Sequence, residues 1–349
     1  MPILTLHREP ARQAYFAGPE RRPVFFDPGL NCWVVSDRDD AEAVLQSRSF
    51  QVVALSEVYE TFQGPSGRTF PNLIFALRHI PVGLNDEAHR DMRRRIAELV
   101  ARRRGAIAGA IPALVEQWIG PIEERDEVEL IGEALSPLVT AFVGVLTETT
   151  IPDLHACRRV SMIFDRMIGL RTRRALEDEV GVVRALIRAS IGSDAPEVEE
   201  GLRLALFALG NDSLVGTIGE SLYRILDEHP GVPFQAIPFP DMPVETGVPF
   251  VERVVAEAVA IGGVRLSPGE RVRVLMQGFA YSPDPLDRAR IFGAGVHACL
   301  GRQMSVDLWR EVVRRLARMR VSAEVVDHAL RDDNYVFTCP AKIVLRIAR

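Results

Sequence analysis

Residues Phe292–Gly301 read FGAGVHACLG, the most informative stretch of this 349-residue chain. The stretch holds three glycines and one cysteine, Cys299, and a helix is predicted directly after it, over residues 306–318. Glycine permits positive φ and lets a flat ligand or another backbone come close. Backbone N–H groups at the start of a helix stabilise a thiolate over a thiol. The pattern therefore predicts a cysteine that is presented from a glycine-rich loop for one bond to a metal ion.

Zinc is the alternative metal, because the tripeptide His-Ala-Cys occurs twice, at His155–Cys157 and at His297–Cys299. Two such pairs could supply the four ligands of a tetrahedral zinc site. The first pair lies in a helical pattern, however, and residues two apart on a helix point to different faces. We therefore favour a site built on Cys299 alone. The remaining cysteines are expected to be small buried residues: Cys32, Cys157 and Cys339.

The composition excludes several classes of protein. Hydrophobic residues make up 47% of the chain and charged residues 26%, which is not the composition of a disordered protein. Four cysteines are too few for a disulfide-stapled scaffold, and a net charge of −5 does not indicate nucleic-acid binding. The N-terminus lacks the layout of a signal peptide, and the most apolar stretch, residues 131–146, is shorter than the roughly 20 residues of a membrane span. We expect a cytoplasmic protein with one domain over residues 1–349.

Helical periodicity dominates the middle of the chain, and short strands are predicted toward both ends. The predicted helices cover residues 39–46, 85–104 with Asn85 or Asp86 as the cap, 107–119, 129–147 with a kink or division at Pro137, 152–167, 173–191 and 196–224. Strands are predicted over residues 23–26 and 32–35, in a hairpin over 264–275 that turns at 267–270, and at the C-terminus. The fold class is therefore mainly α with small β-sheets.

The stretch at Cys299 resembles the heme-binding loop of the cytochrome P450 family, Phe-Gly-x-Gly-x-His-x-Cys-x-Gly. The matching residues are Phe292, Gly293, Gly295, His297, Cys299 and Gly301. The resemblance implies a triangular prism of helices that holds heme b (iron protoporphyrin IX) between a long central helix and the cysteine loop. It further implies that Cys299 is the thiolate ligand of the iron, that Phe292 packs against the heme, and that His297 pairs with a heme propionate.

Two further segments extend this resemblance. The run Asn85–His89, followed by Arg93, is similar to the family's helix that approaches the heme from the side. His89 and Arg93 are four residues apart and share one helical face. Residues 251–263 resemble the strand region ahead of the heme loop. By resemblance, His89 and Arg93 bind one heme propionate and Arg253 binds the other.

The predicted long helix contains Gly210-Asn211-Asp212-Ser213, which resembles the family's oxygen-activating Gly-x-acid-Thr pattern. The resemblance implies that Gly210 makes room for dioxygen, that Asp212 relays protons, and that Ser213 supplies the hydroxyl group of the usual threonine. Serine lacks the threonine methyl group, so its rotamer is less fixed.

Residues 50–84 are expected to form a loop over the substrate pocket. Its apolar residues would line that pocket or, alternatively, only pack the loop: Tyr59, Phe62, Phe70, Leu73, Phe75 and Leu77. Arg68 or Arg78 would be available for a substrate carboxylate.

One feature of the family is missing from the sequence. The helix that carries Glu-x-x-Arg and braces the core behind the cysteine loop should fall within residues 229–249. That segment holds six prolines and cannot form a regular helix. The segment before the cysteine loop, residues 281–291, is short as well, and Arg288 or Arg290 is expected to be its remaining arginine.

The resemblance implies a heme-dependent monooxygenase of bacterial type, which inserts one oxygen atom from dioxygen into a small or mid-sized apolar molecule in specialised metabolism. Electrons would come from a separate ferredoxin-type partner. Its expected docking patch consists of arginines on two helices near the sulfur: Arg94, Arg95, Arg102, Arg103, Arg104, Arg302, Arg310, Arg314, Arg315 and Arg318. The alternatives are a rewired heme-thiolate enzyme, which uses peroxide or catalyses coupling, rearrangement or dehydration, and a non-catalytic binding module.

Overall fold

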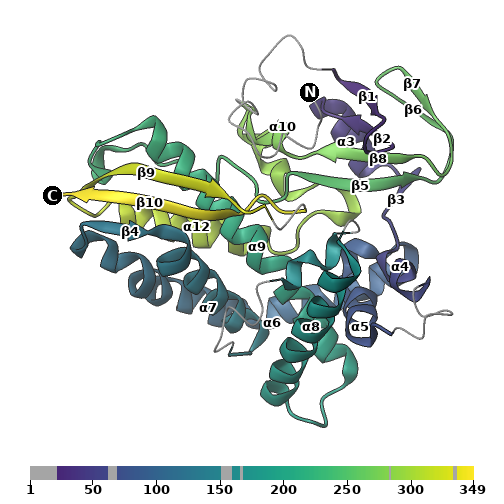
Figure 1. The fold of residues 1–349 in the computed structure, drawn as a ribbon, viewed down its shortest axis with the longest axis horizontal. Helices are drawn as coiled ribbons and strands as arrows, with labels where there is room; N and C mark the ends of the chain where they lie inside the picture. Colours follow the sequence, from purple (N-terminus) through teal and green to yellow (C-terminus); the bar gives the residue numbers. More distant parts are fainter. Residues whose placement is uncertain (1–21, 62–68, 151–158, 166–167, 283, 333–335) are drawn as a thin grey trace.

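The structure is a computed structural model that describes residues 22–61, 69–150, 159–165, 168–282, 284–332 and 336–349 (Figure 1). Its α-helices are α3 (Arg38–Gln46), α4 (Leu55–Thr61), α5 (Pro71–His79), α6 (Asp86–Ile119), α7 (Ser136–Thr147), α8 (Leu170–Ile191), α9 (Glu197–Glu228), α10 (Gln277–Ala280), α11 (Pro285–Arg288) and α12 (Arg302–Leu316). The fold is mainly helical with small sheets, as the sequence predicted. Within the described residues, every helix is too short or too polar to cross a membrane.

Three small sheets lie beside the helices (Figure 1). The five-stranded sheet has the order β1 (Val24–Asp27), β2 (Cys32–Val35), β8 (Arg271–Leu275), β5 (Phe250–Val255) and β3 (Phe50–Gln51). The three-stranded sheet has the order β4 (Glu127–Glu129), β10 (Pro340–Ala348) and β9 (Ser322–Leu330), and β6 (Val259–Ile261) pairs with β7 (Val264–Leu266). The first two predicted strands are present as β1 and β2, and they pair antiparallel. The pairs are antiparallel apart from β2 with β8.

The predicted hairpin over residues 264–275 is wrong. Strand β7 pairs antiparallel with the preceding strand, β6, and the tight turn between them is formed by Gly262 and Gly263, with φ values of 53° and 77°. Two consecutive residues with positive φ match the twist of a two-residue hairpin, and glycine adopts them without strain. Strand β8 joins the five-stranded sheet instead, antiparallel to β5 and parallel to β2.

Helix α6 is one continuous helix, although the sequence predicted a break near Gly105. Its buried residues follow one face across the glycine, from Ile96 and Leu99 to Ile107 and Ile111. Packing of this stripe against α7 and α12 outweighs the roughly 1 kcal/mol that glycine costs inside a helix. Asn85 is the N-cap residue of α6, as predicted, but its side chain makes no capping hydrogen bond. Asn85 instead pairs with the backbone of Val52, accepting from its N–H at 2.9 Å and donating to its carbonyl at 3.0 Å.

The region around Pro137 divides as predicted, into a π-helical turn (Ile131–Leu135) and helix α7. The helix predicted over residues 152–167 falls largely outside the described residues, and its described part, Val160–Phe164, is a 3-10 turn. Residues 229–249 contain only the 3-10 turn Phe234–Ala236, so the proline-rich segment forms no regular helix, as expected.

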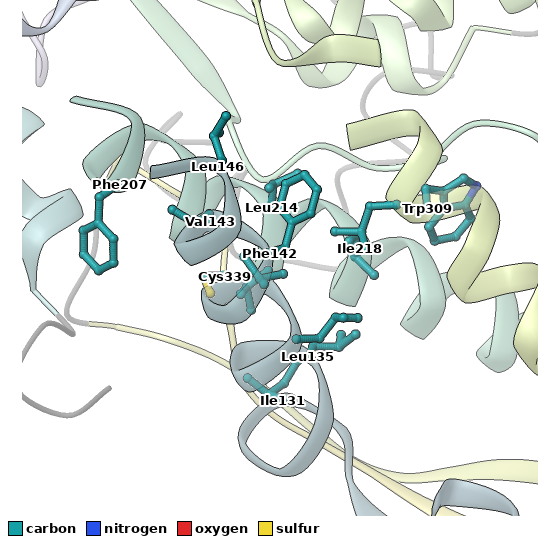
Figure 2. Close-up of a cluster of buried hydrophobic side chains, with 14 of the residues drawn as sticks. Ile131, Leu135, Phe142, Val143, Leu146, Phe207, Leu214, Ile218, Trp309 and Cys339 are labelled. Atoms are coloured by element: carbon teal, nitrogen blue, oxygen red, sulfur yellow. The ribbon is translucent and has the colours of Figure 1, made fainter. Parts of the chain in front are cut away.

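Helix α9 runs through the centre of the helical part and packs against α5, α7, α8 and the sheet of β9 and β10. Figure 2 shows side chains of α7, α9 and α12 meeting in one apolar cluster, among them Phe142, Ile218 and Trp309. Each of these side chains is at most 2% exposed. Burying one large apolar side chain stabilises the fold by about 1.5–3 kcal/mol. This cluster therefore fixes the position of α9 relative to the elements that carry the cysteine loop.

Candidate functional site

The cysteine loop is a series of tight turns between the 3-10 turn Ala289–Phe292 and helix α12. The Cys299 N–H donates to the Phe292 carbonyl at 2.8 Å, which closes the loop. Gly295 has a φ of 66°, and a Cβ atom there would lie 2.4 Å from the Leu45 carbonyl oxygen. Only glycine allows this turn to approach α3 so closely. The local geometry presents the cysteine just ahead of α12, as the sequence predicted.

The Cys299 thiol is exposed, and it lines a large cavity inside the protein. The surrounding protein raises the pKa of Cys299 through burial of its charged form. Hydrogen bonding to the backbone of Gly301 and Arg302, together with the charge of Arg93, opposes this shift. The start of α12 therefore lowers the pKa of Cys299, but the effect of burial, which raises this pKa, is larger. A bound metal ion would reverse the balance, because a coordinating thiol loses its proton.

Four basic side chains gather beside the loop: His89, Arg93, Arg253 and His297. The rings of His89 and His297 are 4.1 Å apart. Among the described residues, neither His89 Nε2 nor His297 Nδ1 has a hydrogen-bond partner, and both atoms are buried. Arg253 is 6% exposed, and its side chain donates to the Glu252 carbonyl at 2.8 Å. Within the described part of the chain, no carboxylate forms an ion pair with either arginine. We call these four residues the basic cradle.

The pKa values of the basic cradle reflect its crowding. Burial lowers the pKa of Arg253 to about 10. Burial, followed by the charge of Arg253, lowers the pKa of His297 to about 3. The pKa of His89 is lowered by burial and by the charges of Arg93 and Arg253. The two arginines therefore carry the positive charge, the two imidazoles are neutral near pH 7, and no carboxylate of the described chain balances the arginines. The cradle therefore suits a ligand that carries carboxylates.

The cavity has a volume of about 360 Å³ and brings together most of the residues that the sequence singled out. The predicted site residues that line the cavity are Arg93, Gly210, Ser213, Arg253, Phe292, Gly293, His297, Cys299 and Gly301. His89 lies behind the ring of His297, and Asp212 is not among the lining residues. Most of the remaining wall is apolar, with Phe142 and Leu209 as examples. One cavity thus combines a free thiol, unpaired cations and an apolar wall.

Solved structures with the same architecture are numerous. No protein-family model matches the chain, and no curated protein matches it in sequence. The structure of CalO2 superposes with a TM-score of 0.75 at 19% identity, covering 98% of this chain and 97% of that one. P450BioI, crystallised with a fatty-acyl carrier protein, gives 0.71 at 17% identity over 94% and 96% of the two chains. A thermophilic cytochrome P450 from Sulfolobus tokodaii gives 0.64 at 20% identity over 95% and 97%.

This chain has the cytochrome P450 fold. The expectation from the cysteine loop is confirmed for the architecture. The chain also keeps the P450 fold without a helix in the proline-rich segment where Glu-x-x-Arg was expected.

In place of that helix, residues 244–248 pack directly on α9. The Thr217 hydroxyl accepts from the Gly247 N–H at 2.9 Å, and a Cβ atom on Gly247 would lie 2.4 Å from the Ser213 carbonyl. Thr217, Thr246 and Val248 all line the cavity. Sequence reasoning missed these residues. The glycine in a proline-rich segment was the available signal, since it marks a close backbone approach.

The Gly210–Ser213 turn of α9 stays helical in this P450 fold. The Ser213 hydroxyl donates to the Leu209 carbonyl one turn back, a bond that bends helices slightly. The Asp212 carboxylate accepts from the Ser161 hydroxyl and forms an ion pair with Arg331 at 3.0 Å. Asp212 is 8% exposed. Its carboxylate is therefore held by protein partners, behind the cavity wall rather than on it.

The segment over residues 50–84 differs from the expected loop. It forms β3, α4, α5 and a 3-10 turn, with residues 62–68, and thus Phe62 and Arg68, outside the described chain. The predicted pocket residues are buried in the core and do not line the cavity: Tyr59, Phe70, Leu73, Phe75 and Leu77. Arg78 is exposed and pairs with Glu60 at 2.9 Å. Val52, Val53 and Leu55 provide the actual lining from this segment.

The arginines predicted to dock a partner are mostly paired with acids in the structure. The pairs are Arg94 and Arg95 with Asp91, Arg102 with Glu199, Arg103 with Glu148, Arg314 with Glu311, and Arg315 with Glu116. No ion pair is present for four others within the described residues: Arg104, Arg302, Arg310 and Arg318. Arg302 is exposed in the first turn of α12, three residues from the cysteine.

The zinc alternative receives no support from the described residues, which contain no group of three or more potential metal-ligating side chains. His155 and Cys157 lie outside the described part of the chain. Cys32 and Cys339 are buried as small core residues, as expected.

Proposed function

We propose that this chain is a heme-thiolate monooxygenase with Cys299 as the iron ligand and heme b as the cofactor. The observation that carries the proposal is the pairing of one cavity-facing thiol with a basic cradle that has no acidic partner in the described chain. The two carboxylates of a heme supply the missing anions. A bound heme with a thiolate ligand would supply the activation of dioxygen: with two electrons from the proposed ferredoxin-type donor and two protons, one oxygen atom would enter a C–H bond of the substrate and the other would leave as water.

Residues of the chain would bind the cofactor, leave space for dioxygen and transfer protons. His297 and Arg253 hold one side of the cofactor by its carboxylates, and Arg93 with His89 holds it from α6. Gly210 lines the cavity without a side chain and leaves room for dioxygen. Ser213 places a hydroxyl group at the cavity wall, and Asp212, the preceding residue on α9, would act as the proton relay.

The substrate is proposed to be a neutral apolar molecule of small or medium size. Among the described lining residues, only Arg93, Glu252 and Arg253 are charged. Both arginines belong to the cradle, and Glu252 forms ion pairs with Arg271 and Arg273 at 2.9 and 2.7 Å. No charged group remains to bind a charged substrate within this wall. Some structural neighbours are named as biosynthetic hydroxylases, such as HmtN of himastatin biosynthesis, which supports a role in specialised metabolism.

The absorption spectrum of the reduced, carbon monoxide-treated protein tests this function. Purified protein reconstituted with hemin should bind one heme and show the thiolate-type band. A protein that binds no heme, or shows only the band of a neutral or nitrogen ligand, would contradict the proposal. Stoichiometric zinc in the purified protein would revive the four-ligand alternative.

A ferredoxin-type donor is proposed to dock near Arg302. This arginine is exposed and forms no ion pair in the described chain, whereas Arg314 on the same helix pairs with Glu311. An unpaired arginine attracts an acidic partner, and salt screens that attraction over about 8 Å at physiological ionic strength. Arg302→Glu should slow reduction by ferredoxin several-fold and make it insensitive to salt, with Arg314→Glu as the matched control. Equal rates in both variants at all salt concentrations would exclude this docking site.

A rewired heme-thiolate enzyme is the second candidate, favoured by one observation. The Asp212 carboxylate is already engaged by Arg331 and Ser161, and the Ser213 hydroxyl bonds to the Leu209 carbonyl. Peroxide brings its own protons and both oxygen atoms, so it needs less of this relay. Turnover with hydrogen peroxide that exceeds turnover with dioxygen and ferredoxin would identify this class.

A further inference from the structure

Glu245 is a buried carboxylate in the proline-rich segment, and it is not itself among the residues that line the cavity. The residue is 3% exposed. Its Oε1 atom accepts from the Tyr281 hydroxyl at 2.7 Å and lies 3.3 Å from the Arg224 guanidinium of α9. The Arg224 guanidinium also lies over the Tyr281 ring, 4.8 Å from its centroid. These three residues form a compact cross-link, which we call the Glu245 cluster.

The Glu245 cluster is anchored on α9 by more than one contact. The Ser221 hydroxyl accepts from the Glu245 N–H at 3.0 Å and from the Val244 N–H at 3.1 Å. A buried carboxylate is stable only when charged and polar partners balance its desolvation, and Arg224 and Tyr281 provide them. The carboxylate therefore has a fixed position relative to the central helix.

The other end of the cluster leads to the cysteine loop. Tyr281 directly follows α10, and α10 packs against the 3-10 turn Ala289–Phe292. The Met276 N–H donates to the Pro249 carbonyl at 2.9 Å, so the proline-rich segment holds α10 at both of its ends. The turn ends at Phe292, whose carbonyl accepts from the Cys299 N–H. A continuous set of contacts thus connects α9 to the residue that closes the cysteine loop.

We propose that Glu245 is a positioning residue for the Cys299 thiolate, acting through Tyr281 and α10. The proposal rests on the heme-thiolate function above. The cluster fixes the short segment 281–291, and this segment fixes where the loop places the sulfur. Residues 229–249 form no regular helix that could brace the cysteine loop, and the Glu245 cluster connects this segment to α9 and α10 instead. Loss of the cluster would let the loop shift and move the sulfur out of position for its bond to the iron.

The chain offers a matched control on the same helix. Glu220 of α9 is also a buried carboxylate, 1% exposed, and it bonds to His328 of β9 at 2.9 Å. His328 lies in strand β9, which pairs with β10 (Figure 1), whereas the Glu245 carboxylate bonds to Tyr281 next to α10. A general cost of neutralising a buried glutamate should therefore appear equally in Glu220→Gln and Glu245→Gln.

The test compares the ratio of thiolate-type to neutral-thiol-type band in the reduced carbon monoxide complex of heme-loaded wild type and variants. We expect Glu245→Gln to lower the ratio by about tenfold, the lower end of what outer-shell changes cost a metal site. Tyr281→Phe, which keeps the ring and removes one hydrogen bond, should lower it roughly fivefold and remains informative where Glu245→Gln fails to fold. Glu220→Gln should keep the wild-type ratio.

Two results would overturn the proposal. If Glu245→Gln and Tyr281→Phe keep the wild-type ratio, the cluster has only a structural role. If Glu220→Gln loses the thiolate band to the same extent, the effect is general destabilisation. A wild-type protein without the thiolate band would instead refute the heme-thiolate function itself, so the two failures are distinguishable.

Discussion

The surroundings of Asp212 and the basic cradle are both buried and polar, but they differ in whether their polar atoms have partners. Around Asp212, an acid, a base and a hydroxyl group satisfy one another: the carboxylate is paired with Arg331 and Ser161. In the basic cradle, His89 and His297 keep unpartnered ring nitrogens, and Arg253 is buried without an acid in the described chain. An unpaired buried polar group costs about 1–3 kcal/mol. The cradle is therefore incomplete by itself, which supports its proposed role in holding a ligand.

Replacement of the sulfur should give the largest effect, because Cys299 is the proposed protein ligand of the metal. Cys299→Ala should remove the thiolate-type band completely while the unfolding temperature of the heme-free protein changes little. Cys32→Ala, which alters a cysteine buried in the five-stranded sheet, is the control and should keep the band. A thiolate-type spectrum in Cys299→Ala would show that another residue ligates the iron.

Substitutions at Asp212 and Ser213 should change the turnover rate and leave substrate binding unchanged. Asp212→Asn is expected to slow dioxygen-dependent turnover by about 10²–10³-fold, within the range of proton-transfer roles, and to leave substrate affinity unchanged. Ser213→Ala should slow it less, because its hydroxyl already bonds to a backbone carbonyl. Asp212→Asn also leaves Arg331 without its carboxylate, so the thermal stability of Arg331→Gln provides the reference. Full turnover in Asp212→Asn would favour the peroxide-driven class.

A substitution in the basic cradle should change how fast bound heme dissociates. Arg253→Gln removes a buried cation that has no acidic partner in the described chain, so the heme-free protein should become no less stable. Heme should dissociate about 10-fold faster, the size of an outer-shell loss at a metal site. Heme transfer to an acceptor protein measures the rate, and Arg273→Gln, which breaks an ion pair with Glu252, is the contrasting variant. Arg253→Gln with wild-type retention would remove Arg253 from the cofactor site.

The smallest expected effect concerns pH. The pKa of His297 is about 3 in the folded heme-free chain, against an ordinary value of about 6.5 when unfolded. Between these values the unfolded chain binds a proton that the folded chain does not, so stability is present above about pH 6.5 and decreases as the pH falls toward 3. His89 adds a contribution of the same sign, because its pKa is also lowered.

Thermal unfolding of the heme-free protein at pH 7 and pH 5 measures this effect. Wild type should lose more stability on acidification than His297→Gln, and bound heme should reduce the difference, since its carboxylates balance the imidazolium charge. Parallel pH profiles for wild type and His297→Gln would contradict the assigned burial of this ring.

The elements that the sequence predicted well are those with local causes. The helical stripe of α9, the strands β1 and β2 and the division at Pro137 depend on residues close in the chain. The failures have non-local causes. Helix α6 continues through Gly105 because α7 and α12 pack along it. The pairing of β7 with β6 is the exception, because its turn at Gly262 and Gly263 is a local signal that the prediction missed. The sequence left open whether the aromatic residues of 50–84 line the pocket or only pack their own segment, and the burial of Tyr59, Phe70 and Phe75 in the core depends on α8 and α9.

By itself, the sequence determined the glycine spacing of the cysteine loop and the absence of a helix in residues 229–249. Both follow from backbone geometry within a few residues. Only the tertiary structure decided which charges are neutralised. Arg331 reaches Asp212 across 119 residues, and Glu245 reaches Tyr281 across 36, whereas Arg253 meets no acid in the described chain. Burial and ion pairing depend on side chains that folding brings together, so the same arginine-rich composition yields a complete cluster around Asp212 and an incomplete cradle beside Cys299.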